Sequence, residues 1–331
     1  MPRHHLVPRF YLRRFADDRQ NLVVVDRDPP HRSRMRPVKR VCAQEGYYAM
    51  PTETIAESHR VGHDPEMVER VLSQIEHKAA QALTHLLDGQ FPPTVEDRYR
   101  LTQFIALQKT RTRRFREDAE AVGTLAAQQY IEMELTNNPE RIPQWLKSRG
   151  EAHDVAAVQA VRDNLSERFP KLRMSQTFAV QQALRMAIDA YHPHLVQRPW
   201  RLFRFDTDCL VTSDNPVGTW SPRSPDEQPA VDGINATMIV MPLDRRTALA
   251  LMDRGTERVV DLPAASTRAR QINLAVVSEA SRSIFHHPAD RPLDGIEVPR
   301  RTAFIDEVIG IRIPGDGTIR EQHRVIKRPI S

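Results

Sequence analysis

The most informative segment for the fold is TVEDRYRLTQFIALQKTRTRRF at residues 94–115. Apolar side chains recur in it at the three- and four-residue spacing of one helix face. The members of this stripe are Leu101, Phe104, Ile105, Thr112 and Phe115. The spacing continues with few helix-breaking residues, so it predicts one long helix from residue 94 to about residue 135, with the stripe turned toward the core.

Two polar residues, Gln108 and Arg111, fall on or beside the same face of this helix. A buried amide or guanidinium destabilises the fold unless it finds a hydrogen-bond partner. One interpretation is that both residues face a polar cavity and bind a substrate there. The other is that backbone groups satisfy Gln108, and that Arg111 extends its charged end to the protein surface. Both interpretations stay open, and both residues are candidates for substrate binding.

The segments around the central helix set the fold class. Residues 65–88 and 172–191 show the same helical spacing. After residue 199 the pattern changes to short apolar or alternating stretches separated by turn residues, namely WRLFRF, CLVT, TMIVMPL and TALALM. A helix is expected at about 264–279. The sequence therefore predicts a mainly helical α+β fold, with long central helices and a small antiparallel sheet built mostly from residues after 199.

A chain of 331 residues with 40% hydrophobic residues is long enough to bury a sizeable core. We expect a single compact domain over residues 1–331 with four sub-regions. Residues 1–50 form a basic arm with a short strand from Asn21 and an exposed loop from Asp28 to Pro37, and residues 51–195 are helical. Residues 196–290 hold the sheet and a helix, and residues 291–331 form an irregular tail. Two cysteines, Cys42 and Cys209, do not make a disulfide framework.

The run HHLVPRFYLRRF at residues 4–15 concentrates reactive, cationic and aromatic side chains. A histidine exchanges a proton near neutral pH or ligates a metal, so His5 is a candidate catalytic base. His4, Arg9 and Tyr11 are candidates for substrate binding, because an arginine fork fits carboxylate or phosphate. The alternative is a docking arm, in which the aromatic rings fill a groove while the cations stay in water.

The charge of the chain is concentrated at the N-terminus. Residues 1–40 hold eleven Lys or Arg and four Asp, a net charge of +7, whereas the whole chain carries +5. Such a patch attracts phosphate groups, so nucleic acid or a phosphate-bearing ligand is the expected partner. No zinc finger, basic zipper or RNA-binding aromatic signature is present. No run approaches the roughly 20 apolar residues of a membrane span, so we expect a cytoplasmic protein without a membrane partner.

A third candidate segment is TSDNP at residues 212–216, directly after the expected strand CLV. Pro216 disfavours helix at Asn215, and Ser, Asp and Asn bond readily to nearby backbone groups, so the segment is a turn. Most such turns are structural. In the functional interpretation, Asp214 is a catalytic base or metal ligand, and Ser213 and Asn215 orient the substrate.

Several motifs in this order resemble a known family. They are HHLVPRFYLRRF at the start, FIALQKTRTRRF at 104–115, WRLFRFDTDCLVTSDNPV at 200–217 and MPLDRRTALAL at 241–251. Together they are similar to the family of the domain of unknown function 4238 (DUF4238). The second motif departs from the family pattern, because Arg113 stands where a proline is expected. The resemblance implies a largely bacterial, intracellular protein and brings no established activity.

Two functional hypotheses follow. The first is an enzyme acting on a phosphate-containing substrate, for which a metal-dependent phosphodiesterase or nuclease is the leading version and a divalent metal the cofactor considered. It requires His5, Gln108, Arg111 and Asp214 to line one cleft, in which an arginine lowers the pKa of Asp214. The second is a non-catalytic protein whose basic arm docks nucleic acid or an acidic protein. The sequence leaves the oligomeric state open.

Overall fold

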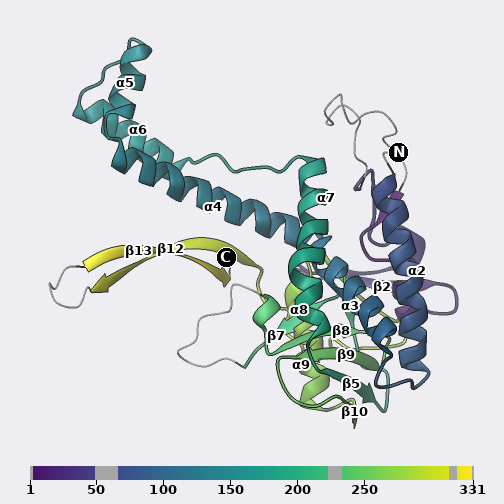
Figure 1. Cartoon of the computed structure of the whole chain (residues 1–331). Helices are drawn as coiled ribbons and strands as arrows, with labels where there is room; N and C mark the ends of the chain where they lie inside the picture. The colour runs from purple at the N-terminus through teal and green to yellow at the C-terminus, as the bar shows by residue number, and fades with distance from the viewer. Residues whose placement is uncertain (1–2, 49–65, 223–232, 313–318, 330–331) are drawn as a thin grey trace. The chain divides into compact units, whose positions relative to one another are not determined.

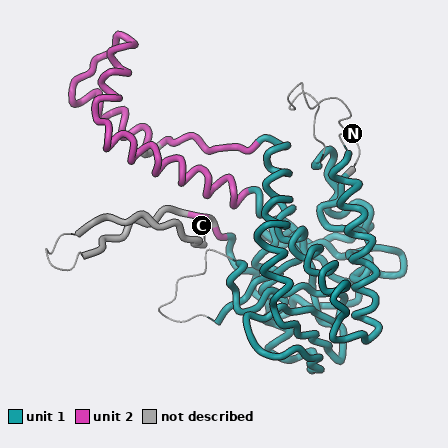
Figure 2. Tube along the Cα trace, viewed as in Figure 1, with its two compact units in different colours: residues 1–116, 175–301, 331 teal, residues 117–174, 302–330 magenta. Residues whose placement is uncertain are grey.

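A computed structural model describes residues 3–48, 66–222, 233–312 and 319–329 (Figure 1). Helix accounts for 47% of it and strand for 18%, which confirms the mainly helical α+β class. The chain divides into two compact units where one compact domain was expected (Figure 2). The first contains residues 1–116 and 175–301, and the second contains residues 117–174 and 302–330.

Helices dominate one side of the first unit. The helix α2 (Met67–Leu87) packs against α3 (Val95–Thr110). The helix α2 buries one apolar stripe, whereas the second half of α3 is buried on nearly every face. The helix α7 (Gln176–Arg185) continues through a π-helical turn (Met186–Tyr191) into α8 (His192–Val196), and this continuous run also packs on α3. The helices predicted at 65–88 and 172–191 are therefore confirmed as elements, with slightly different ends.

The long helix predicted from residue 94 to about residue 135 is broken. The helix α3 ends at Thr110, and α4 (Arg113–Asn137) begins after a bend at residues 111 and 112. The Thr112 hydroxyl accepts a hydrogen bond from the Phe115 backbone N–H at 3.2 Å. A threonine in this role satisfies a free N–H at a helix start, so it favours the beginning of a new helix at this position.

The residues after 199 form a five-stranded sheet with the order β10-β5-β9-β8-β7. Its strands are β5 (Trp200–Phe205), β7 (Gly218–Trp220), β8 (Met238–Pro242), β9 (Thr247–Met252) and β10 (Arg258–Leu262). All neighbours pair antiparallel except β10, which runs parallel to β5. The expected sheet is present, with one parallel edge that the sequence pattern did not indicate.

A second sheet joins the N-terminal segment to the residues after 210, in the order β3-β2-β11-β6. Its strands are β2 (Asn21–Asp26), β3 (Ser33–Pro37), β6 (Thr212–Ser213) and β11 (Ser283–His286). The prediction of an exposed loop from Asp28 to Pro37 is wrong for the second half of that segment, because β3 pairs there with β2. An edge strand needs only backbone hydrogen bonds, so its polar side chains do not prevent pairing.

Short elements complete the first unit. A ribbon of β1 (Arg3–His5) and β4 (Ala43–Glu45) pairs antiparallel. Between these strands lie α1 (Arg9–Leu12) and two single-turn 3₁₀ helices, η1 (Arg13–Phe15) and η2 (Val38–Arg40). The helix α9 (Thr267–Glu279), capped by the Ser266 hydroxyl, packs on β6, β7 and β8. It confirms the helix predicted at about 264–279.

The second unit contains most of α4 together with α5 (Arg141–Ser148) and α6 (Val155–Glu167). It also contains β12 (Thr302–Arg312) and β13 (Ile319–Pro329), which pair antiparallel along their whole length. The prediction of an irregular tail at residues 291–331 is therefore wrong for the strands that begin at residue 302. No helix in the described ranges is both long and apolar enough to cross a membrane.

Candidate functional site

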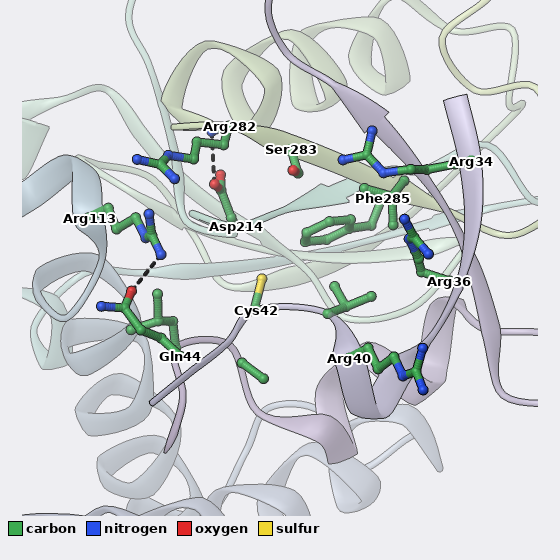
Figure 3. A pocket seen from close by; sticks show the side chains of 14 residues that line it. Arg34, Arg36, Arg40, Cys42, Gln44, Arg113, Asp214, Arg282, Ser283 and Phe285 are labelled. Atoms are coloured by element: carbon green, nitrogen blue, oxygen red, sulfur yellow. Dashed lines mark hydrogen bonds between the residues drawn. The ribbon is translucent and has the colours of Figure 1, made fainter. Parts of the chain in front are cut away.

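A cavity of about 550 Å³ lies in the first unit, where β3, the β1–β4 ribbon, the start of α4 and the loop before β11 meet (Figure 3). Its volume is in the range of small-molecule sites in proteins. Five of its lining residues are arginines, and one is a carboxylate. These residues are Arg34, Arg36, Arg40, Arg113, Arg282 and Asp214.

Asp214 is held by the turn that follows β6. The Ser213 hydroxyl accepts from the Asn215 N–H at 3.1 Å and donates to the Asn215 carbonyl at 2.8 Å, which fixes the turn. The two carboxylate oxygens of Asp214 accept from the backbone N–H groups of Ser281 and Arg282, both at 2.8 Å. The carboxylate therefore ties its turn to the loop between α9 and β11, and it has a fixed position in the pocket wall.

Burial raises the pKa of Asp214 to about 6. The backbone N–H groups of the loop and the Arg113 guanidinium favour the charged form, but they do not offset the loss of water. An arginine therefore does lower the pKa of Asp214, as expected, but desolvation outweighs it and the net shift is upward. The arginine is Arg113 and not the Arg111 of the expected cleft. A carboxyl that titrates near pH 6 can accept or donate a proton under physiological conditions.

Two arginines lie on the same side of the pocket as Asp214, and we call them the inner pair (Figure 3). Arg113 is the first residue of α4, and its guanidinium donates to the Gln44 side-chain carbonyl on β4. Arg282 is exposed and precedes β11. Within the described part of the chain, neither guanidinium forms an ion pair within 4.0 Å of a carboxylate. Both can therefore turn toward an anion in the pocket.

The other three arginines lie across the pocket on β3 and η2 (Figure 3). Arg34 and Arg36 alternate along β3, so both point to one face of the strand. Arg34 donates to the Asp26 carboxylate at 2.7 Å, and this pair is locally neutral. Arg36 and Arg40, which we call the outer pair, are exposed and have no acidic partner among the described residues.

Part of the pocket lining is apolar, and its side chains at Leu6, Val24, Val41 and Phe285 are buried. Figure 3 shows Phe285 in the wall between the two arginine pairs. Cys42 projects from this wall between the two pairs, as Figure 3 shows, and its φ of 53° lies in the left-handed region. Burial raises the pKa of the Cys42 thiol well above its usual value, so the thiol stays protonated at neutral pH and is a poor nucleophile.

Of the residues proposed from the sequence, Asp214 lines this pocket. Its neighbours Ser213 and Asn215 are buried in the turn, and the Asn215 amide donates to the Glu279 carbonyl at 3.1 Å. Tyr11 lies in the core, where its hydroxyl donates to the Pro242 carbonyl at 2.7 Å. These three side chains form internal hydrogen bonds and do not line the pocket.

Three other candidates gather in a separate buried cluster. The His4 ring stacks on Tyr48 with 5.5 Å between ring centroids, and His4 Nδ1 accepts from the Tyr48 N–H at 2.8 Å. The Arg111 guanidinium donates to the Glu76 carboxylate at 2.7 Å. In the amide orientation that satisfies both groups, the Gln108 carbonyl accepts from Arg111. Internal partners therefore satisfy Gln108 and Arg111.

The expected cleft of His5, Gln108, Arg111 and Asp214 is not the pocket found here, since only Asp214 lines it. His5 lies on β1 opposite Ala43, next in sequence to a lining residue. Arg9 is exposed on α1 and does not line the pocket either. A catalytic role for His5 stays a prediction.

The sequence analysis missed the arginines that line the pocket, although signals for them were present. The local charge of +7 over residues 1–40 includes Arg34, Arg36 and Arg40. The alternation in SRMRP places two of them on one face of a strand once the strand is recognised. Arg113 is the residue at which the second motif departs from the family pattern. No local signal points to Arg282.

A metal site is not assigned. Within residues 3–48, 66–222, 233–312 and 319–329, we find no group of three or more His, Cys, Asp or Glu side chains arranged to hold an ion. The pocket itself presents a single carboxylate. The chemistry of the site is therefore derived from its arginines and from Asp214.

Comparison with known proteins gives one match. The family model described as protein of unknown function (DUF4238) matches residues 3–290, which include the whole pocket. No curated protein and no solved structure matches the chain.

Proposed function

The chain belongs to the DUF4238 family of proteins of unknown function, and we propose from its pocket that it is an enzyme acting on a phosphate-containing substrate, as a phosphodiester hydrolase. One observation carries this proposal. Five arginines line a cavity of small-molecule size together with a single carboxyl group, whose pKa is raised by burial to about 6. Arginine forks bind phosphate oxygens through two parallel hydrogen bonds, and a carboxyl with this pKa is suited to proton transfer.

The charge balance of the pocket favours a polyanion. Asp26 neutralises Arg34, which leaves the inner and outer pairs facing the carboxylate of Asp214. Four cations against one anion leave a strong positive excess even when Asp214 is ionised. A neutral or cationic ligand does not balance this charge, whereas phosphate esters do.

The reaction that fits these groups is attack of water on phosphorus. Asp214 takes a proton from the water, whose oxygen forms the new bond to phosphorus. The phosphorus–oxygen bond to the leaving alcohol breaks, and its electron pair stays on the alcohol oxygen. That oxygen takes up a proton from solvent water while Asp214 releases to solvent the proton it gained, so the products are a phosphate monoester and an alcohol. The inner pair binds the non-bridging oxygens and stabilises the negative charge that they carry in the transition state.

The test is hydrolysis of bis(p-nitrophenyl) phosphate by the full chain, with and without Mg²⁺ or Mn²⁺. We expect Asp214→Asn to lower kcat/KM at least about a hundredfold, as is usual for loss of a general base. The pH profile of kcat/KM should rise with an apparent pKa near 6, because Asp214 must be ionised. Asp18→Asn, which removes an exposed carboxylate outside the pocket, is the control. Unchanged hydrolysis by Asp214→Asn would contradict the assigned role.

A second candidate function is non-catalytic docking of nucleic acid or an acidic protein. It is favoured by the exposure of Arg9 and Arg13 on α1 and η1, and of the arginines on β3. Docking depends on the exposed cations alone, so it predicts binding without hydrolysis and no effect of Asp214→Asn. The hydrolysis assay therefore separates the two candidates.

A further inference from the structure

The cations of the pocket form two separate groups. The inner pair, Arg113 and Arg282, lies beside Asp214, and the outer pair, Arg36 and Arg40, lies across the cavity (Figure 3). A single phosphate bound at the inner pair leaves the outer pair without an anion. Asp26 forms an ion pair with Arg34, but no acidic side chain of the described residues pairs with Arg36 or Arg40. The pocket therefore has more cationic positions than one phosphate can fill.

The space between the pairs is chemically different from either end. Phe285 and the protonated thiol of Cys42 lie there (Figure 3), and Leu6, Val24 and Val41 also line the pocket with buried side chains. An apolar wall between two cationic ends fits a ligand whose anionic groups are joined by an organic segment. Adjacent phosphates of a pyrophosphate have no such segment, so they leave this wall without a partner.

We propose that the substrate carries two phosphate groups joined by an organic segment, as in a nucleotide. The first phosphate lies at the inner pair and is the one attacked, because Asp214 is there. The second lies at the outer pair and positions the substrate, while the organic segment covers the apolar wall. Two sources supply two phosphates joined in this way. Two successive phosphates of a nucleic acid strand include the diester bond that is hydrolysed, whereas a free nucleoside bisphosphate has no diester bond and binds in the same manner without being cleaved by this reaction. The inference rests on the proposed function of this pocket and names its substrate class.

Binding is measured on the full chain carrying Asp214→Asn, so that the ligands are not hydrolysed. The probes are adenosine 3′,5′-bisphosphate against adenosine 5′-monophosphate, and the dinucleotide pdTpdT against dTpdT. In each pair the first ligand has the additional phosphate. We expect it to bind about tenfold more tightly or better, because two charge-assisted arginine contacts are added. A larger gain for pdTpdT identifies the strand as the source, and a larger gain for the bisphosphate identifies the free nucleotide.

The arginine variants locate the additional phosphate. Arg36→Ala combined with Arg40→Ala should reduce the preference for the additional phosphate to less than about twofold. Arg113→Ala combined with Arg282→Ala should weaken both members of each pair. Lys39→Ala, which removes an exposed cation of η2 that does not line the pocket, should keep the full preference.

The outcomes separate this inference from the proposed function. Equal binding of the two members in both ligand pairs overturns the inference, and so does a preference that survives loss of Arg36 and Arg40. Hydrolysis dependent on Asp214 can still be found in either case, which leaves the proposed function standing. Conversely, a preference that disappears with the outer pair supports the inference even when no hydrolysis is detected. Absence of binding by all four ligands overturns the inference, and the hydrolysis assay still decides the proposed function.

Discussion

The raised pKa of Asp214 makes the stability of the protein depend on pH in a defined direction. Its pKa is about 6 in the folded state, against a value of 3.8 for an unperturbed Asp side chain. The folded state therefore binds this proton more tightly than the unfolded state. Stability from this group is fully present below pH 3.8 and is lost as the pH rises through 6.

The size of the effect follows from the two pKa values. A difference of about two pKa units corresponds to about 3 kcal/mol of unfolding free energy at neutral pH. The carboxylate is only partly buried by accessible area, so water reduces this figure, which is an upper value. An ionised Asp214 thus destabilises the fold, which is common for groups retained at functional sites.

The assay compares the wild-type protein with Asp214→Asn by urea unfolding between pH 4 and pH 7.5. The amide does not titrate, so the wild-type free energy of unfolding minus that of the variant should fall by about 2–3 kcal/mol across this range. The comparison cancels the other titrating groups, and Asp18→Asn controls for the loss of one charge. A difference that stays flat, or that rises with pH, would refute the assignment of a raised pKa.

Three further predictions follow from described contacts. Tyr11→Phe should lower the free energy of unfolding in urea by about 1–3 kcal/mol, because Thr212 and Pro242 lose a buried hydrogen-bond partner. The Kd of ligands in the pocket should change by less than about twofold. Gly218→Ala should destabilise by about 1–3 kcal/mol in the same assay, since the added Cβ would lie 2.7 Å from the Ala275 carbonyl carbon of α9; a neutral effect would contradict the packing of α9 on β7. If the chain binds single-stranded DNA through its exposed N-terminal cations, Arg9→Ala combined with Arg13→Ala should reduce the slope of log affinity against log salt by about 1.4; an unchanged slope excludes both residues from the contact.

The sequence was sufficient to locate the helices and the turn, because the hydrogen bonds of these elements join residues close together in the chain. Helical spacing over residues 65–88, 172–191 and 264–279 located α2, α7 with its continuation, and α9. Each of these helices has its backbone hydrogen bonds within one segment, so a short window of sequence contains the information. The turn at residues 212–216 was recognised for the same reason, because Ser213 and Asn215 bond to each other.

Several strands could be identified only from the structure, because their backbone hydrogen bonds are made with distant segments of the chain. The strand β3 has an exposed, arginine-rich sequence, and it is a strand because β2 provides its backbone partners. The hairpin of β12 and β13 likewise depends on pairing between two segments. A strand forms its hydrogen bonds with another part of the chain, so composition alone does not reveal it.

The candidate site shows the same division. Asp214 was identified from its own turn, but its raised pKa depends on burial by other segments, which its turn does not encode. Gln108 and Arg111 share a helix face with the core, and only packing shows that Glu76 pairs with Arg111 outside the pocket. The pocket collects arginines from β3, η2, α4 and the loop before β11. Charge excess is visible in the sequence, whereas the convergence of these cations on one carboxylate is a property of the tertiary fold.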